Sequence, residues 1–345
     1  MSLLQETCGA ITGRSLEIER HIIDSWNTAS PVERYGRLVN MVAQYGAATN
    51  QETLAVPKPC MIIASADHGV ADMGVSAYPK ETTVGMTQNY LIPKGAGANS
   101  LANYCGAQME VIDMGIDADM SWVPGLRSHK LGMGTKNFVE EPAMTREQAV
   151  EGIETGIRLV KEKIDEGFNV FLVGEMGISN TTASALMTAK FAGLTAEEAT
   201  GRGTNISDER LKLKQRIVHD VLEKYKDIPK DDAIGILSSV GGFEFACIVG
   251  VILGAAANHG LVIIDGFNTS ACALVAKTLA PKAMDYVMAS HLSAEKAAKS
   301  SLENLGLEAY VDLGLCLGEA SGGSIQMGML DLAVHMYMAI TGGNK

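Results

Sequence analysis

Apolar residues near both ends of the chain follow the spacing of helices. Leu16, Ile18, Ile22 and Trp26 recur about one helical turn apart, and residues 38–43 repeat the pattern after a proline. The segment 327–340 is apolar on one side, which predicts a closing helix that packs with the N-terminal helices. We therefore expect residues 1–55 and 321–345 to form a small helical domain.

The pattern changes at Pro57 to short apolar runs, each followed by a polar or glycine-rich turn and then a longer amphipathic stretch. Alternation of this kind is typical of strands joined by helices in a parallel sheet. The predicted strands are residues 60–64, 110–113, 170–173, 235–238, 262–265 and 309–313. We expect an α/β fold in which residues 56–320 form one large domain around a six-stranded, doubly wound parallel sheet.

The charge and cysteine content narrow the function classes. The formal net charge is −12, so nucleic acids and anionic membranes are poor partners. The most apolar window, residues 246–257, is too short to cross a bilayer.

The six cysteines are scattered singly without a CxxC pair, and no histidines stand in zinc-ligand spacing, so we expect core cysteines and no metal site. The first 20 residues carry three glutamates and no apolar signal sequence, which predicts a cytoplasmic protein.

The turns after the predicted strands concentrate acids and glycines. Ligands of open α/β sheets bind at the carboxyl ends of the strands, and five of the six turns there combine an acidic residue with a glycine. This composition favours a polar ligand with anionic and neutral parts.

Two of these segments suit a phosphate. Residues 174–182 (GEMGISNTT) run from a strand into a helix beginning near Asn180, where free N–H groups meet the Thr181 and Thr182 hydroxyls. An ordinary N-cap by Ser179 or Asn180 explains the same residues equally well. Residues 201–205 (GRGTN) precede a helix with Lys212, Lys214 and Arg216 near its start; a bound anion would compensate these cations, although a solvated basic face is the simpler interpretation.

Two acidic segments are candidates for proton transfer. Glu319 ends an apolar run (LGLCLGEASGG), where desolvation would raise the pKa of its carboxyl and make it a general base, although it could equally cap a helix. The Asp67-His68 dipeptide favours structural hydrogen bonding over a metal or acid–base site.

Taken together, these turns match a known family. The matching segments are ADHGV (66–70), GVSAYPKETT (74–83), GAGANSLA (95–102), GEMGISNTT (174–182), GRGT (201–204), VGGFE (240–244), DGF (265–267), ASHLSAE (289–295) and LGLCLGE (313–319). In this order they resemble the nicotinate-nucleotide:dimethylbenzimidazole phosphoribosyltransferases, which activate the lower-ligand base of cobamides, the vitamin B12 group. The resemblance covers residues 15–340.

The resemblance implies transfer of a 5-phosphoribosyl group from nicotinate mononucleotide to an aromatic base, without a metal or organic cofactor. It also implies a Rossmann-like six-stranded parallel sheet flanked by helices, with a smaller helical domain formed by both chain ends, and a dimer. By motif, Glu319 matches the general base. The nucleotide and phosphate residues would be Glu175, Gly177, Asn180, Thr181, Thr182, Gly203 and Lys214, and the base pocket would contain Ser76, Tyr78, Met86 and Leu317.

One departure from the family pattern concerns the acceptor base. Many members carry glutamine just before the methionine that corresponds to Met86, whereas this chain has Val84-Gly85-Met86. We expect a relaxed or shifted base range that includes benzimidazoles, purines or phenols.

Two alternatives stay open at this point. An oxidoreductase on the same kind of sheet would need a GxGxxG turn after the first strand, which residues 66–74 do not supply. The chain could instead be a non-catalytic or co-catalytic subunit that pairs with a paralogue, so the dimer could be of like or unlike chains.

Overall fold

The centre of the molecule is one parallel sheet. A computed structural model describes residues 2–342. The sheet has six strands in the order β3-β2-β1-β4-β5-β6, with every pair parallel. The strands are β1 (Pro59–Ala66), β2 (Gln108–Gly115), β3 (Arg127–Ser128), β4 (Val170–Met176), β5 (Leu261–Ile264) and β6 (Val287–Ala289). This order is that of a Rossmann-type doubly wound fold and confirms the predicted fold class.

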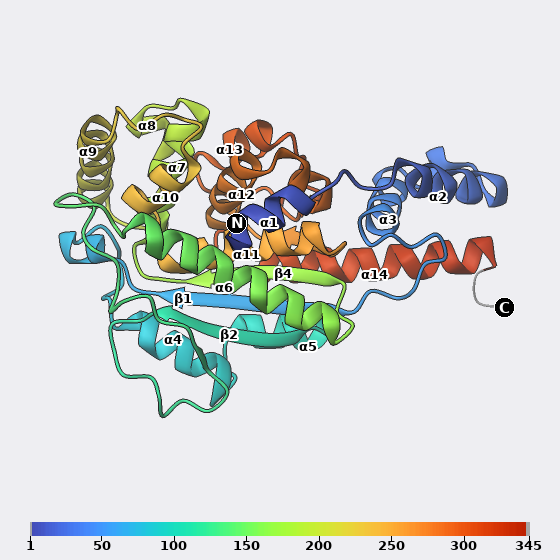
Figure 1. Ribbon diagram of the computed structural model, residues 1–345, viewed down its shortest axis with the longest axis horizontal. Helices are drawn as coiled ribbons and strands as arrows, with labels where there is room; N and C mark the ends of the chain where they lie inside the picture. Colours follow the sequence, from blue (N-terminus) through green and yellow to red (C-terminus); the bar gives the residue numbers. More distant parts are fainter. Residues whose placement is uncertain (1, 343–345) are drawn as a thin grey trace.

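Fourteen helices are described around this sheet (Figure 1). The first seven are α1 (Leu3–Ala10), α2 (Leu16–Ala29), α3 (Arg37–Ala48), α4 (Thr82–Leu91), α5 (Gly97–Cys105), α6 (Arg146–Asp165) and α7 (Asn180–Ala192). The others are α8 (Ala196–Ala199), α9 (Asp208–Lys224), α10 (Ala233–Val240), α11 (Phe243–Ala257), α12 (Phe267–Leu279), α13 (Ala298–Leu305) and α14 (Ser321–Thr341). Within residues 2–342, no helix combines the length and the apolar composition needed to span a membrane.

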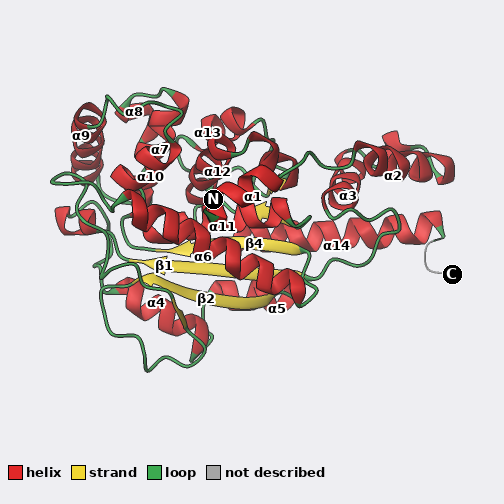
Figure 2. Cartoon of the chain, in the orientation of Figure 1, coloured by secondary structure: helices red, strands yellow, loops and turns green. Residues whose placement is uncertain are grey.

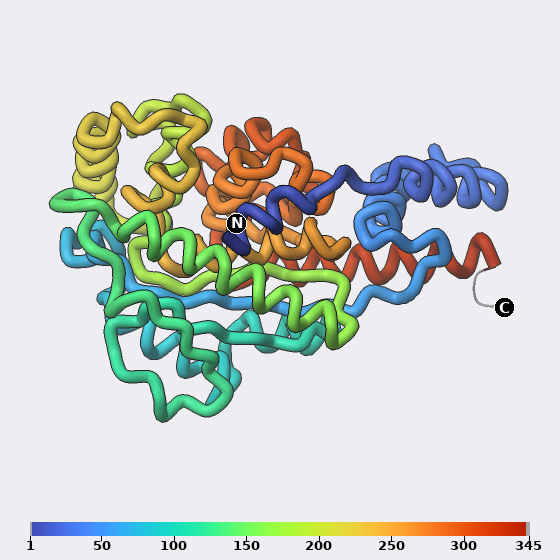
Figure 3. The backbone as a smooth tube through the Cα atoms, viewed as in Figure 1, coloured from blue at the N-terminus to red at the C-terminus, as the bar shows by residue number. Residues whose placement is uncertain are grey.

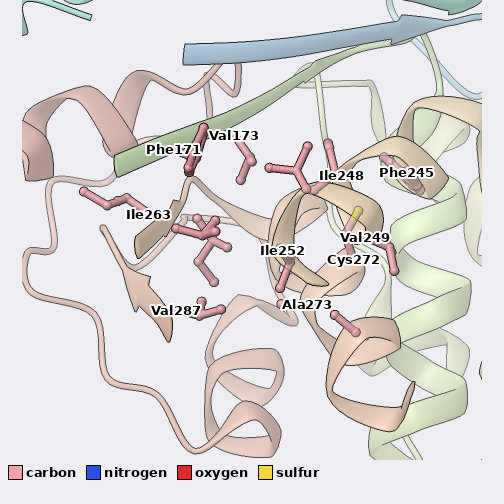
Figure 4. Packing of buried hydrophobic residues seen from close by; sticks show 14 of the residues in the cluster. Phe171, Val173, Phe245, Ile248, Val249, Ile252, Ile263, Cys272, Ala273 and Val287 are labelled. Atoms are coloured by element: carbon pink, nitrogen blue, oxygen red, sulfur yellow. The ribbon is translucent and has the colours of Figure 1, made fainter. Parts of the chain in front are cut away.

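Helices cover both faces of the sheet, as Figure 2 shows. Helices α6, α11 and α12 pack together in one layer, and α4, α5 and α14 lie on the other face. All eight residues of β1 are buried as a result. Figure 4 shows the core on the α11 side, where Phe171 and Val173 of β4 and Ile263 of β5 pack toward Ile248 and Ile252. Burial on both faces explains why the central strands are continuous apolar runs.

Two of the predicted strands are wrong. Residues 235–238 lie in α10, which the Asp232 carboxylate caps by accepting a hydrogen bond from the Gly235 N–H at 2.9 Å. Because α10 is buried on all sides, its apolar run has no helical period that would distinguish it from a buried strand. Residues 309–313 form no strand but a single bridge from Val311 to His291. The true outer strands, β3 and β6, have two and three residues and carry almost no pattern.

The two ends of the chain meet as predicted. Helices α2 and α3 pack on α14, where the Trp26 and Tyr337 rings lie 5.5 Å apart. In Figure 3 the dark-blue α1 lies apart from this group, against α6 and α11, and the Leu4 N–H donates to Glu154. The division into a small domain (1–55 and 321–345) and a large one (56–320) stays a prediction.

Candidate functional site

A cavity of about 130 Å³ lies at the carboxyl ends of β4, β5 and β6. Its walls are Glu175–Ile178, Asn180, Thr181, Gly203, Thr204, Asp265–Asn268, His291, Ser293, Glu295 and Cys316–Glu319. The site therefore stands beside the point where the strand order reverses between β1 and β4, the usual ligand crevice of such sheets.

Glu319 occupies a constrained turn just before α14. Its φ is 58° and that of Ala320 is 59°, so two consecutive non-glycine residues adopt the left-handed region. Strained backbone of this kind is found at functional sites, where the surrounding structure holds the residues in place. Burial raises the pKa of the Glu319 carboxyl, the nearby Asp265 charge raises it further, and the Tyr90 hydroxyl partly offsets this. The raised pKa makes Glu319 a better proton acceptor.

Two neighbours hold the Glu319 turn in place. The Asp265 carboxylate Oδ1 accepts hydrogen bonds from the Gly322 and Gly323 N–H groups at 2.6 and 3.1 Å, which caps α14. A Cβ at Gly174 of β4 would lie 2.7 Å from the Ala320 nitrogen, so only glycine lets the turn approach the strand this closely. Glu319 itself therefore does not cap α14, and its carboxylate is left for the cavity.

Glu175 is the second carboxyl group of the cavity. Its Oε2 accepts a short hydrogen bond from the Asn180 amide, and that amide's oxygen accepts one from Asn268 at 3.0 Å. Burial is the main cause that raises the pKa of Glu175 to about 8, and the Glu244 and Asp265 charges add to it. The chain beside Glu319 lies against it, because a Cβ at Gly318 would be 2.9 Å from the Glu175 Oε1.

The first turn of α7 is open to a ligand. Ser179 stands at the N-cap position with φ 77° and makes no capping hydrogen bond through its side chain, so the ordinary N-cap interpretation is wrong. The Asn180 side chain is engaged by Glu175 and Asn268. The Asn180 and Thr182 N–H groups donate to the Gly177 and Ser179 carbonyls at 3.2 and 3.0 Å, but the end of the helix keeps a positive partial charge for an anion.

A lysine stands behind this helix end. The Lys214 Nζ of α9 donates to the Thr181 hydroxyl at 2.8 Å, and a Cβ at Gly203 would lie 3.4 Å from the same Nζ. Lys214 is 1% exposed, and burial lowers the pKa of its ammonium to about 8, against the opposing effect of Glu295. A buried cation beside a helix N-terminus is a suitable phosphate site, because a phosphate dianion would provide the negative countercharge that stabilises the ammonium form of the lysine.

The expected base-pocket residues are divided. Leu317 lines the cavity and is 59% exposed. Ser76, Tyr78 and Met86 are not among its walls. Ser76 contacts one of the walls, since its hydroxyl lies 3.4 Å from the hydroxyl of Thr204, which lines the cavity. Met86 packs on the core, and Val84 packs on a second small apolar cluster around Ile116.

The structure thus gathers most of the expected site. The cavity brings together Glu319, Glu175, Gly177, Asn180, Thr181, Gly203 and Leu317, with Lys214 one hydrogen bond away. Thr182 is fully buried in α7 and does not line it. Sequence reasoning missed Asp265, Asn268 and His291 as site residues, although the DGF segment contains Asp265 and ends just before Asn268, and the ASHLSAE segment contains His291.

Comparison with known proteins identifies this arrangement. A family described as "Phosphoribosyltransferase" matches residues 15–343. The nicotinate-nucleotide–dimethylbenzimidazole phosphoribosyltransferase of Geobacter sulfurreducens is 43% identical over 310 residues, which are 90% of this chain and 88% of that protein. The chain belongs to this phosphoribosyltransferase family. The enzyme of the same name from Chloroflexus aggregans is 40% identical over 336 residues, which are 96% of this chain and 94% of that protein.

Solved structures of the phosphoribosyltransferase family have the same fold. CobT from Thermus thermophilus superposes with a TM-score of 0.88 at 33% identity, covering 93% of this chain and 96% of that one. A second structure, titled as the nicotinate-nucleotide–dimethylbenzimidazole phosphoribosyltransferase of the same organism, gives 0.87 at 31% identity, over 96% of this chain and 99% of that one. The protein is an enzyme of the phosphoribosyltransferase class.

Proposed function

We propose that this enzyme transfers the 5-phosphoribosyl group of nicotinate mononucleotide to an aromatic base, giving an α-riboside 5′-phosphate and nicotinate for the lower ligand of a cobamide. One observation carries the proposal: a carboxyl group with a raised pKa, Glu319, shares a small cavity with an uncapped helix N-terminus backed by Lys214. The names of the relatives supply the substrates that fit these two ends.

The phosphate end fixes the nucleotide. In the proposed complex the 5′-phosphate accepts hydrogen bonds from the first turn of α7 and from Thr181, and it keeps the Lys214 side chain in its ammonium form. Holding the phosphate fixes the ribose relative to the incoming base, which converts a bimolecular attack into a positioned one.

The acid end performs the proton transfer. A ring nitrogen of the base forms a bond to C1′ while the C1′–N bond of nicotinate breaks, and nicotinate leaves with the electron pair as a neutral pyridine nitrogen. Glu319 takes the proton from the other ring nitrogen, and its charge stabilises the positive ribose centre. Attack opposite the departing ring inverts C1′ from β to α.

The acceptor base would lie against the apolar wall next to Glu319. Met176 and Leu317 line this part of the cavity, while Val84 and Met86 face apolar clusters instead. Glycine stands before Met86, and Gln88 of α4 is not among the cavity walls. We therefore propose a base range that includes purines and phenols, with a phenol attacking through its oxygen. Competition between dimethylbenzimidazole and p-cresol tests this, and a preference for the former by orders of magnitude would contradict it.

We further propose that the enzyme is a dimer. An apolar patch, defined here as Leu317, Tyr104 and Leu332, runs from the cavity mouth over α5 to α14; these side chains are 59%, 84% and 63% exposed. The patch residues lie on neighbouring elements, because Leu317 lies next to Gly97 at the start of α5 and Tyr104 of α5 lies next to Gly328 of α14. Large exposed apolar groups gathered in this way mark interaction sites. The cytoplasmic location stays a prediction from the N-terminal sequence.

The first experiment is a mass-spectrometric assay of the purified chain. Nicotinate mononucleotide is offered with dimethylbenzimidazole, adenine, phenol and p-cresol. A riboside phosphate product establishes the reaction and ranks the bases. No product from a folded chain, with product restored by a co-expressed paralogue, would instead favour the subunit alternative.

A further inference from the structure

A buried histidine–glutamate pair lies behind the cavity, and the proposed transfer does not use it. The His68 Nε2 is 2.6 Å from the Glu244 Oε1, and both side chains are fully buried. His68 follows β1 in the ADHGV segment, and Glu244 stands in the first turn of α11 in the VGGFE segment. Neither residue lines the cavity.

The pair is in contact with the nucleotide turn. A Cβ at Gly177 would lie 3.2 Å from the His68 Cδ2, 3.3 Å from the Glu244 Oε1 and 2.5 Å from the Ala66 carbonyl oxygen. Gly242 presses on the pair from the other side, since a Cβ there would lie 2.6 Å from the His68 Cε1. The turns after β1, after β4 and before α11 therefore all meet at this pair.

Stability alone does not explain these two side chains. The His68 Nδ1 and the Glu244 Oε2 are buried without hydrogen-bond partners, and each such atom costs about 1–3 kcal/mol. An apolar pair of similar volume would avoid this cost. What an apolar pair could not supply is a negative charge immediately behind the Gly177 turn, where the first-turn position in α11 favours the Glu244 carboxylate.

We propose that His68 and Glu244 are positioning residues for the transfer: His68 holds the Glu244 carboxylate against the back of the Gly177 turn, so that the turn and the charge behind Glu175 are fixed for the nucleotide. The role rests on the proposed function, because it acts through the residues that bind nicotinate mononucleotide. Neither residue touches the substrate in this arrangement.

The charge environment of Glu175 makes the role measurable. The Asn180 and Asn268 amides lower the pKa of Glu175, and the Glu244 and Asp265 charges raise it. Tyr90 of α4 lies near both carboxyl groups: burial, and then the charges of Glu319 and Glu175, raise the pKa of its hydroxyl. Glu244→Gln removes one of the two carboxylates that raise the Glu175 pKa and leaves the other groups in place, so the ionisation of Glu175 moves to lower pH.

The experiment compares kcat/KM for nicotinate mononucleotide against pH in the full chain, in E244Q and in E175Q. The ionisation that disappears in E175Q belongs to Glu175, and we expect it about one pH unit lower in E244Q. Glu110→Gln is the matched control: it breaks a partly buried ion pair, Glu110 with Lys163 at 2.9 Å, near the start of β2 and away from the cavity. The control lowers the melting temperature and leaves the profile unchanged. If E244Q had the same pH profile as the unaltered chain, the pair would have only a structural role and the proposal would be overturned.

A second set of variants keeps the test independent of E244Q folding. His68→Gln keeps an N–H donor for Glu244 and should stay within about threefold of the normal KM, whereas His68→Ala should raise KM about tenfold with a smaller change in kcat. Equal KM values for the two variants would contradict the proposal.

A ¹³C-carboxyl titration of Glu175 by NMR separates the two failures. If the unaltered chain forms no product, the proposed function is wrong, but the shift of Glu175 in E244Q is still expected. If the chain is active and the shift is missing, the positioning role is wrong.

Discussion

Two carboxyl groups in one cavity have different surroundings, and this divides their roles. Glu175 is enclosed, and its pKa of about 8 keeps a proton on it at neutral pH. The pKa of Glu319 is raised too, but the nearby Tyr90 hydroxyl opposes the shift. Groups whose pKa values are set apart in this way take separate parts in acid–base chemistry. This difference supports the proposal that Glu319 accepts the proton and that Glu175 binds the nucleotide.

Glu319→Gln should lower kcat by about 100- to 10,000-fold, because the amide keeps the shape but cannot accept the proton. Binding of nicotinate mononucleotide, measured by calorimetry, should stay within about threefold. Since the Glu319 pKa is raised, the acid limb of kcat in the unaltered enzyme should lie above the ordinary carboxyl range. Glu303→Gln on the exposed side of α13 is the control. Normal turnover of E319Q would remove the general-base assignment.

Lys214 gives nucleotide binding a pH dependence at the alkaline side. Below a pH of about 8 the side chain is an ammonium, and above it the neutral amine predominates in the free enzyme. The Kd for nicotinate mononucleotide should therefore be constant from about pH 7, where the phosphate is mostly a dianion, to about pH 8, and rise up to about tenfold per pH unit above that.

Lys214→Met should weaken binding at pH 7 by about 10- to 100-fold and remove the part of the rise above pH 8 that Lys214 causes, leaving only the part that Glu175 causes. The exposed Lys212→Met, two residues earlier on α9, should change neither. An equally steep alkaline rise in K214M would show that another group binds the phosphate.

Residues at the ends of apolar runs were predictable, and residues that reach the site from elsewhere were not. Glu319 and Glu175 stand where a run ends in glycine and acid, so the sequence marks them. Tyr90 reaches Glu319 from inside α4, where nothing in the sequence distinguishes it from a core tyrosine. Its role depends on how α4 packs on the sheet, which is a property of tertiary structure.

At the scale of elements, the sequence pattern did not distinguish a buried helix from a buried strand. The central strands β1, β4 and β5 were found because each is a four- to eight-residue apolar run before a turn. The run in α10 looks the same, and only the Asp232 cap and the Arg146 guanidinium bound to that carboxylate at 2.8 Å set its helical start. The cap is local, but the Arg146 contact and the packing of α10 on α6, α7 and α12 are long-range and absent from a local pattern.

The capping of α14 by Asp265 should couple stability to catalysis. Asp265→Asn removes the charge that caps the helix and should lower the free energy of unfolding by about 1–2 kcal/mol, measured by denaturant titration. Because the Asp265 charge also raises the Glu319 pKa, the acid limb of kcat should move to lower pH. Asp331→Asn, farther along α14, should leave that limb unchanged. An unmoved limb in D265N would show that the two carboxyl groups do not interact.

At the scale of the whole molecule, one helix packs against both proposed domains. Helix α14 starts just after the Glu319 turn, crosses β4 and β5, and then packs against α2 and α3 near the chain end. A boundary at residue 321 therefore divides a continuous packing unit. The meeting of the two ends was predictable from their helical patterns, but independence of the domains is not a property that such patterns carry.

The patch of Leu317, Tyr104 and Leu332 predicts the assembly. Leu332→Glu places a charge in the middle of an apolar contact and should convert the dimer to a monomer in sedimentation velocity measurements. Met133→Glu, in the loop before α6, is a similarly exposed control that should remain a dimer. A monomer in the unaltered chain, or a dimer that tolerates L332E, would remove the patch as the interface.

The length of α14 has a practical consequence. Its 21 residues span about 30 Å, so the helix acts as a lever arm with the Glu319 turn at one end and Thr341 at the other. A tilt of a few degrees at the cavity becomes a displacement of ångströms at the far end. A fluorophore placed at Thr341 would therefore report a tilt of the helix at the cavity. A bulky tag fused at the same end would press on the helix that begins at the Glu319 turn.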